Sequence, residues 1–350
     1  AEPVPSLLRG FSAPVVLDYE YSDQQLLALL AHDTDPFNRW EAAQRLATGR
    51  ALTFIRTEGE VQLDAPYVEA MRTVLRHPRL DAAFKELVLT LPGETYIAEQ
   101  LDVVDPQRVH AVREAMRAQL AGALLADWEW AYEAHRDSGA YNPDPTSSGR
   151  RALAGLALTN LCLAARASGD SVWPGKAFQR FKDASNMTDR FNALAALVTT
   201  GHELAVQALQ RFHAMFRNEA LVLDKWFALQ AGAPDRGGNV LPVVRQLMAH
   251  PDFNIRNPNR ARSVIFSYCS ANPGAFHRAD AAGYVFWGDR VIELDGINPQ
   301  VAARLARALD RWKKLAEPQR SAAREAIARV AAKPDLSNDV REVVTRALAE

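Results

Sequence analysis

Residues 256–262 read RNPNRAR and residues 298–304 read NPQVAAR, and these two stretches decide the fold class. Each predicts the start of a helix, because Asn supplies the side-chain oxygen of an N-cap and Pro occupies the first helical position without losing a hydrogen bond. The first turn of a helix carries a partial positive charge and favours Asp or Glu. Arg256, Arg260 and Arg262 crowd the first start instead. A departure from a local preference commonly has its cause outside the helix.

The helix predicted at 299–315 has an apolar face bordered by cationic side chains. Arginine and lysine recur there every three or four residues, and Arg304 lies at the border between the two faces. One interpretation is a solvated face, or pairing with acidic neighbours such as Asp295 and Asp310. The other is a cationic wall facing an anionic ligand, since the planar guanidinium binds carboxylates with two hydrogen bonds. The apolar positions are Val301, Leu305, Ala308, Leu309, Trp312 and Leu315.

Signals for helix starts recur along most of the chain. Residues 22–25 (SDQQ) form a capping box before an apolar run, and Asp-Pro pairs at 35–36 and 105–106 open further helices. Residues 137–148 are rich in Gly, Asn and Pro and predict a loop. Many short helices joined by such turns predict an all-α fold, an irregular array of helix pairs that forms an α-solenoid or superhelical bowl. No repeat of fixed period stands out.

Residues 1–17 differ from the rest of the chain. Residues 7–12 and 15–19 are short β-like runs interrupted by prolines, which predicts a short β-strand segment at the N-terminus. Two strands without a sheet are not stable alone. They are therefore expected to belong to a domain outside this chain, or to pair weakly along an edge.

Composition restricts the function classes. The chain has 350 residues, of which 48% are hydrophobic and 24% charged, and its net charge of −1 removes the usual electrostatic case for nucleic acid or an anionic membrane surface. No apolar run is long enough to span a membrane and no secretory leader is visible, so a cytoplasmic location is expected. Cys162 and Cys269 are far apart in apolar helical contexts and predict buried free thiols.

Three catalytic or binding motifs fail on inspection. Residues 201–206 (GHELAV) begin like the zinc-protease helix His-Glu-x-x-His, but Val206 replaces the second histidine and the zinc would lose a ligand. Residues 169–176 lack the spacing and the hydroxyl of a phosphate loop. Residues 186–189 (NMTD) predict an N-cap rather than a glycosylation site. The other histidines show no metal-ligand spacing, so no catalytic residue and no metal site is predicted.

Several stretches together resemble the C-terminal part of the bacterial aminopeptidase N family. They follow the family's order over nearly the whole chain and lie at 3–15 (PVPSLLRGFSAPV), 21–26 (YSDQQL), 186–189 (NMTD), 224–230 (DKWFALQ), 257–260 (NPNR) and 298–302 (NPQVA). The family consists of zinc aminopeptidases of the gluzincin type. The resemblance implies that residues 1–17 are the terminal strands of a preceding small β domain and that residues 18–350 are the helical C-terminal domain.

The resemblance also implies where the chemistry lies. The zinc helix, the Gly-Ala-Met-Glu-Asn substrate loop and the catalytic tyrosine have no counterpart here, so zinc is expected in a missing catalytic domain and no cofactor in this chain. The chain is then a non-catalytic domain that closes the substrate chamber, with the catalytic domain of the same polypeptide and peptide substrates as partners. Arg304 occupies the position of an arginine that meets the C-terminal side of the peptide in the family, and Arg262 occupies a second position that faces the chamber; both are expected to bind substrate.

Two other interpretations remain open. The chain could be an independent helical-repeat scaffold whose concave face binds a protein or peptide. It could also be an unrelated hydrolase that uses scattered His and Glu residues. The β-like residues at the N-terminus argue against the independent scaffold, because a self-contained solenoid has no use for unpaired strands.

Overall fold

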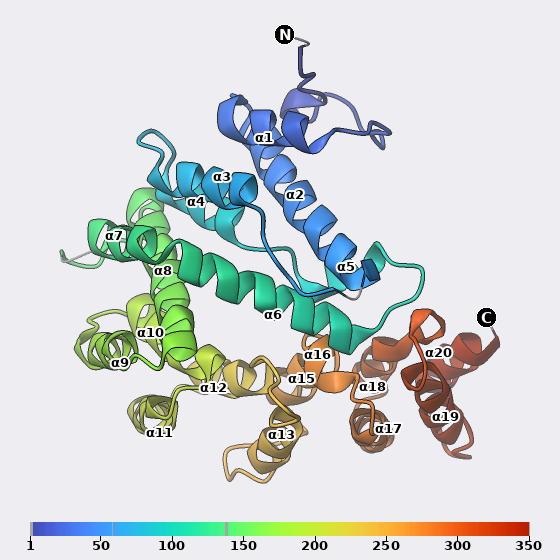
Figure 1. Cartoon of the computed structure of the whole chain (residues 1–350). Helices are drawn as coiled ribbons and strands as arrows, with labels where there is room; N and C mark the ends of the chain where they lie inside the picture. Colours follow the sequence, from blue (N-terminus) through green and yellow to red (C-terminus); the bar gives the residue numbers. More distant parts are fainter. Residues whose placement is uncertain (1–2, 58, 137–138, 350) are drawn as a thin grey trace. The chain divides into compact units, whose positions relative to one another are not determined.

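The structure, a computed structural model, describes residues 3–57, 59–136 and 139–349, and helices are the dominant element throughout them (Figure 1). Those residues contain no β-strand, only an isolated bridge between Val104 and Leu315. The predicted all-α class is confirmed. The chain divides into two compact units: unit 1 comprises Ala1–Ile97 and Ala111–Ala208, and unit 2 comprises Ala98–His110 and Leu209–Glu350.

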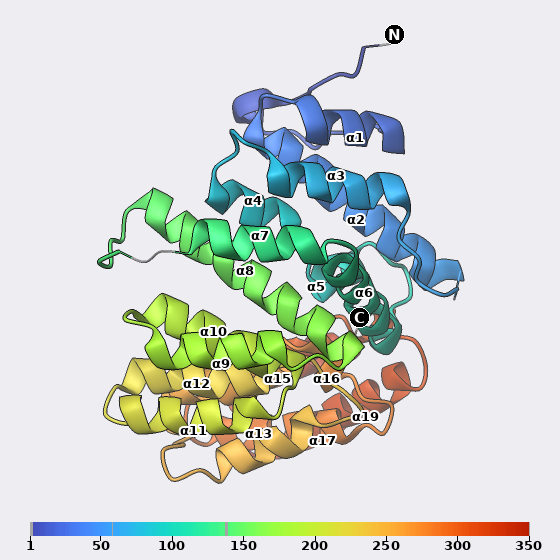
Figure 2. The ribbon, with the colours of Figure 1, turned by 60° about the vertical axis from the view of Figure 1, so that its left-hand side comes forward.

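Unit 1 is organised around the long helix α8. Four other helices, α4, α7, α9 and α10, pack against it, and α7 and α10 run beside it in Figure 2. Leu153 and Leu161 of α8 are completely buried in these contacts. The helices are α1 (Asp23–His32), α2 (Pro36–Thr57), α3 (Ala65–Arg76), α4 (Ala82–Leu89), α5 (Glu94–Glu99), α6 (Pro106–Ala123), α7 (Leu125–His135), α8 (Pro145–Ser168), α9 (Val172–Asp183) and α10 (Met187–Thr200), of which α5 and α6 cross the unit boundary.

The predicted helix starts of unit 1 are confirmed. The Ser22 side chain accepts a hydrogen bond from the Gln25 N–H, and the Gln25 side chain accepts one from the Ser22 N–H, which completes the capping box. Asn186 caps α10 by accepting from the Asp189 N–H at 2.9 Å. The loop predicted at 137–148 is shorter, because α8 already begins at Pro145; residues 137–138 lie outside the described residues.

The short strands predicted at the N-terminus are not formed in residues 3–19; residues 1–2 lie outside the described residues. Leu8 and Phe11 have φ angles of 53° and 57°, left-handed values that no extended strand contains. Arg9–Phe11 instead forms a single 3-10 turn. The physical reason is the lack of a partner strand to accept and donate backbone hydrogen bonds. The assignment of residues 1–17 to a preceding domain stays a prediction.

Polar contacts hold this N-terminal segment on α1 and α2. Ser6 and Arg9 both donate to the Asp33 carboxylate, at 2.6 and 2.7 Å. Asn38 of α2 donates to the Leu7 carbonyl at 3.0 Å. The segment is therefore fixed to the helices by side chains rather than by a sheet.

Unit 2 contains shorter helices and more irregular turns. In Figure 1, α17 lies beside α18 and α19, and α20 packs on α18 and α19. None of the helices in the described residues of either unit is both long and apolar enough to cross a membrane. The elements are α11 (Leu204–Phe216, which begins in unit 1), α12 (Ala220–Ala231), α13 (Val240–Met248), α14 (Pro258–Ala261), the π-helix η2 (Arg262–Phe266), α15 (Ser267–Cys269), α16 (Pro273–Phe276), α17 (Ala282–Asp295), α18 (Pro299–Ala306), the 3-10 turns η3 (Arg307–Leu309) and η4 (Trp312–Lys314), α19 (Gln319–Ala331) and α20 (Asn338–Ala349).

The prediction of one continuous helix at 299–315 is wrong for its second half. The α-helix ends at Ala306, and two 3-10 turns follow it. The cause is a distant contact: the Val104 N–H donates to the Lys314 carbonyl and the Val104 carbonyl accepts from the Ala316 N–H, both at 2.7 Å. The apolar face survives this change. Val301, Leu305, Leu309, Trp312 and Leu315 are all buried, and Ala308 is partly buried.

Aromatic side chains fill the core of unit 2. Tyr268, Phe276 and Trp287 are completely buried. Their polar atoms are satisfied, since the Trp287 indole N–H donates to the Leu305 carbonyl at 3.0 Å and Tyr268 donates to the Ala275 carbonyl at 3.1 Å. Cys162 and Cys269 are buried free thiols, as predicted.

Gly283 allows α17 to start against this core. A Cβ atom at this position would lie 2.0 Å from the Phe276 carbonyl oxygen and 3.1 Å from the Tyr268 hydroxyl. Neither atom can move easily, because one is backbone and the other is buried. The approach of α17 to α16 therefore requires the absence of a side chain.

We expect Gly283→Ala to lower the free energy of unfolding by about 3 kcal/mol, because the added methyl overpacks a rigid core. The matched control is Gly175→Ala in α9, where a Cβ meets no atom within 4 Å. That change should be neutral or stabilise by up to about 1 kcal/mol through its helix propensity. Urea denaturation of both variants checks the prediction, and equal stabilities would contradict it.

Candidate functional site

Arg260, one of the arginines that breaks the charge preference at a helix start, is buried with a relative exposure of 5%. Its Nε donates to Asp224 Oδ1 of α12 at 2.6 Å, which pairs the buried charge. Its other nitrogens donate to the backbone carbonyls of Ala220 and Asp252. The guanidinium also lies 4.8 Å from the ring centre of Phe227. Arg260 is thus explained by structure rather than by a ligand.

The two predicted helix starts in unit 2 are confirmed. Asn257 accepts hydrogen bonds from the N–H groups of Asn259 and Arg260. Asn298 accepts from the Val301 N–H at 3.2 Å. Each Asn is followed by Pro at the first helical position, so the local signal alone determined both starts.

Arg262 is exposed, and it begins a five-residue π-helix, Arg262–Phe266. Its guanidinium makes one long hydrogen bond, 3.5 Å, to the Asn259 side chain. The three residues that follow, Ser263, Val264 and Ile265, are buried and anchor this turn. A π-helical turn inserts one residue into the regular ladder and is frequent at functional sites.

Arg304 is exposed in the last turn of α18. It forms no hydrogen bond or ion pair with any residue that the structure describes. Its neighbours differ. Arg307 lies 3.9 Å from Asp310, and Arg311 pairs with Glu99 at 2.5 Å. Arg307 and Arg311 therefore pair with acids, whereas Arg304 is exposed to solvent and unpaired among the described residues.

The prediction that Asp295 pairs with these arginines is wrong, whereas Asp310 lies beside Arg307. Asp295 is buried and accepts hydrogen bonds from the Ser337 N–H at 2.9 Å and from the Ser337 hydroxyl at 2.5 Å. It fixes the start of α20 and is bound to no arginine among the described residues.

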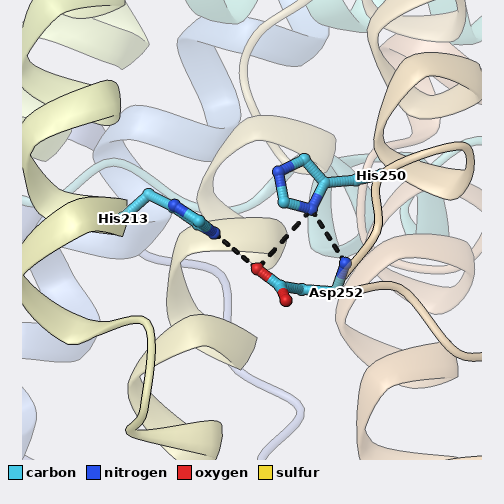
Figure 3. A group of neighbouring side chains, drawn as sticks. All are labelled: His213, His250 and Asp252. Carbon is cyan, nitrogen blue, oxygen red and sulfur yellow. Dashed lines mark hydrogen bonds and ion pairs between the residues drawn. The ribbon is translucent and has the colours of Figure 1, made fainter.

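The structure brings together a group that the sequence did not indicate. His213 of α11, and His250 and Asp252 of the turn after α13, place their ligand atoms within 4.8 Å of one another (Figure 3). His213 Nε2 lies 2.6 Å from Asp252 Oδ2, and His250 Nδ1 lies 3.8 Å from the same oxygen. Burial, followed by the nearby His213, lowers the pKa of His250 below its ordinary value. The sequence signal is weak, since only the His-x-Asp spacing at 250–252 is local.

Residues 202–206, whose likeness to a zinc-protease helix the sequence already argues against, form the turn and first residues of α11. The His202 ring accepts a hydrogen bond from the Leu204 N–H at 3.2 Å and so belongs to the turn that begins α11. Val206, in the place of the second histidine, is 62% exposed and has no ligand atom. Residues 202–206 therefore do not supply the paired histidines of a zinc-protease helix.

Comparison with known proteins identifies the family. The profile described as "Domain of unknown function (DUF3458_C) ARM repeats" matches residues 23–349, which is nearly the whole chain. The chain belongs to this family. ARM repeats are helical repeats, in agreement with the predicted array of helix pairs.

Curated relatives carry the name aminopeptidase N. The chain is 37% identical over 352 residues to aminopeptidase N of Escherichia coli (strain K12), covering 99% of the chain and 40% of that protein. It is 35% identical over 349 residues to aminopeptidase N of Caulobacter vibrioides, covering 99% of the chain and 39% of that protein. The chain thus spans about two fifths of the length of these relatives and corresponds to their C-terminal helical domain.

A solved structure agrees with the sequence matches. The crystal structure of Legionella pneumophila aminopeptidase A in complex with aspartic acid superposes with a TM-score of 0.88 at 28% identity. The superposition covers 100% of this chain and 41% of that protein. Sequence and structure therefore both relate the chain to one part of larger aminopeptidases.

We expect Arg260→Met to lower the free energy of unfolding by about 3 kcal/mol, because Asp224 would be left as a largely buried, unpaired carboxylate. Arg324→Ala, an exposed arginine of α19, serves as the control and should change stability by less than about 0.5 kcal/mol. Chemical denaturation measures both. A double variant, Arg260→Met with Asp224→Leu, should recover part of the loss, and its failure to do so would contradict the charge-pair explanation.

Proposed function

We propose that this chain is the non-catalytic helical domain of a zinc-dependent aminopeptidase that removes N-terminal amino acids from peptides, and that it closes the chamber in which peptides bind. One observation carries the proposal: relatives named aminopeptidase N match 99% of this chain with only about 40% of their own length. More than half of each relative is thus left for a catalytic domain. Zinc is expected there, because residues 202–206 of this chain do not fit a zinc site.

The N-terminal segment supports a covalent link to a further domain. Phe11, Val15 and Val16 are 72%, 60% and 96% exposed, which is unusual for such apolar side chains lying close together in the sequence. A preceding β domain would cover them and would supply the strand partners that this segment lacks. The catalytic domain of the same polypeptide is then the first partner of this chain.

Arg304 and Arg262 are the proposed contacts to the peptide. Arg304 is exposed and forms no ion pair within the described residues, and Arg262 makes only one long hydrogen bond. Both guanidinium groups are therefore free to bind an anion. A peptide presents a carboxylate at its C-terminal end, and a planar guanidinium binds that group with two hydrogen bonds. The role of these arginines is positioning rather than chemistry.

The proposal includes a cytoplasmic location. Cys162 and Cys269 are unpaired and buried. Free thiols of this kind persist in reducing compartments. The balanced charge and the two thiols support the assignment together.

The isolated 350-residue chain is expected to leave an alanyl chromogenic substrate uncleaved, whereas the longer polypeptide that contains it should cleave that substrate. The reason is that residues 202–206, which begin like a zinc-protease helix, carry Val206 in place of the second histidine. Steady-state hydrolysis measured on both proteins checks the prediction. Turnover by the isolated chain would overturn the proposal and would return attention to His202 and Glu203. An inactive longer polypeptide would favour an independent binding scaffold.

Arg304→Ala, made in the longer polypeptide, should raise KM for short peptides about tenfold with little change in kcat, because a lost contact to a carboxylate weakens binding by about 1.4 kcal/mol. The same variant should behave as wild type on peptides with an amidated C-terminus, where that carboxylate is absent. Arg324→Ala is the matched control and should leave KM unchanged on both substrates. An unchanged KM for Arg304→Ala on free-acid peptides would exclude the proposed contact.

A further inference from the structure

Hydrogen bonding alone does not explain why the side chains of His213, His250 and Asp252 lie together. Two imidazoles and one carboxylate come from two segments, α11 and the turn after α13, and converge on one point in unit 2 (Figure 3). The three side chains are 25%, 27% and 38% exposed. They are thus largely shielded, yet an ion from solvent can reach them.

The distances suit a small divalent ion. Zinc binds imidazole nitrogen and carboxylate oxygen at about 2.0–2.2 Å, so two ligand atoms of a tetrahedral site lie about 3.4 Å apart. The observed pairs, 2.6 Å from His213 Nε2 to Asp252 Oδ2 and 3.8 Å from His250 Nδ1 to the same oxygen, lie on either side of that value. All three ligand atoms lie within 4.8 Å of one another, so side-chain adjustments rather than a change of fold would bring them to ligand distance.

One nitrogen is already in the form that a metal requires. The Asp252 backbone N–H donates to His250 Nδ1 at 3.1 Å, which makes Nδ1 the unprotonated nitrogen of this ring. The Asp252 N–H engages the lone pair of this nitrogen, which also lies 3.8 Å from Asp252 Oδ2. A bound ion would take over this lone pair and would replace the proton between His213 and Asp252.

The surrounding framework holds the three groups in place. Trp226 of α12 contacts both rings, with ring centres 5.1 Å from His213 and 5.3 Å from His250. Arg260 donates to the Asp252 carbonyl and so fixes the backbone of that residue. The positive charge of Arg260 does not oppose a cation strongly, because Asp224 pairs with it at 2.6 Å. Such fixed supports are typical of metal sites, where neighbouring groups orient the ligands.

We propose that His213, His250 and Asp252 form a binding site for a divalent transition-metal ion, zinc being the best fit to two imidazoles and one carboxylate. A solvent molecule would complete the tetrahedron, since three protein ligands leave one position open. The ion would join α11 to the turn after α13 and stabilise unit 2. This site is separate from the zinc expected in the catalytic domain, and it departs from the sequence-based prediction that the chain holds no metal.

Zinc binding to the metal-stripped 350-residue chain, measured by calorimetry and by metal analysis after dialysis, tests the proposal. One zinc per chain and a zinc-dependent rise in Tm are expected. His213→Gln and Asp252→Asn should each raise Kd at least about tenfold. The control His202→Gln removes an imidazole just before the start of α11, at the opposite end of the helix from His213, and should bind zinc as wild type does. Asp252→Asn retains the side-chain volume, so it keeps the test valid if His213→Gln does not fold.

A second measurement locates the ion. Cobalt(II) quenches tryptophan fluorescence at short range, and Trp226 lies against both histidines. Saturable quenching that disappears in Asp252→Asn and shrinks in Trp226→Phe is expected. No saturable zinc uptake, or uptake unchanged in both His213→Gln and Asp252→Asn, would overturn the proposal. Neither result depends on the aminopeptidase proposal, because both measurements use the chain alone and read metal binding.

Discussion

A buried positive charge is the constraint on which much of unit 2 depends. The Arg260 guanidinium cannot stay inside the protein without compensation, because a buried unpaired charge costs several kcal/mol. Asp224 supplies the countercharge from α12, and the carbonyls of Ala220 and Asp252 accept the remaining hydrogens. One side chain thus joins α12, the turn after α13 and the start of α14. The positions of Arg262, two residues later, and of the histidine cluster both follow from this junction.

Local interactions determined what the sequence could predict of the fold. All four predicted helix starts are found, because each cap accepts a hydrogen bond from a backbone N–H no more than three residues later in the chain. The capping residues are Ser22, Asn186, Asn257 and Asn298. The end of α18 was missed because its cause, pairing of Val104 with the segment around Leu315, joins residues far apart in the chain. The N-terminal strands were predicted from β-like composition, but a strand also needs a partner, and composition does not supply one.

In the candidate site, too, local sequence signals predict some features, whereas others depend on contacts between distant residues. Helix periodicity placed Arg304 at the border of the apolar face, and its side chain is exposed, but the anion it would meet is not part of this chain, so periodicity cannot specify that anion. The sequence did not indicate His213 and His250 together, because metal-ligand spacing is a local signal, whereas these two rings meet where α11 and the turn after α13 both contact Trp226. For Arg260 the sequence contained a clear signal, a positive charge at a helix start, but only the structure shows that this charge is paired with Asp224.

Because of the π-helix at Arg262–Phe266, the direction in which side chains project from this helix depends on a single inserted residue. A π-helical turn contains one residue more than an α-helical turn, and each residue of an α-helix advances by about 100°. Deletion of one residue here would restore the regular α-helical hydrogen-bond pattern. It would also rotate the residues before the deletion, about the helix axis, relative to the residues after it. Arg260 would then leave Asp224, or Tyr268 would leave the aromatic core. The insertion is therefore what permits one continuous helix to bury an arginine at one end and a tyrosine at the other.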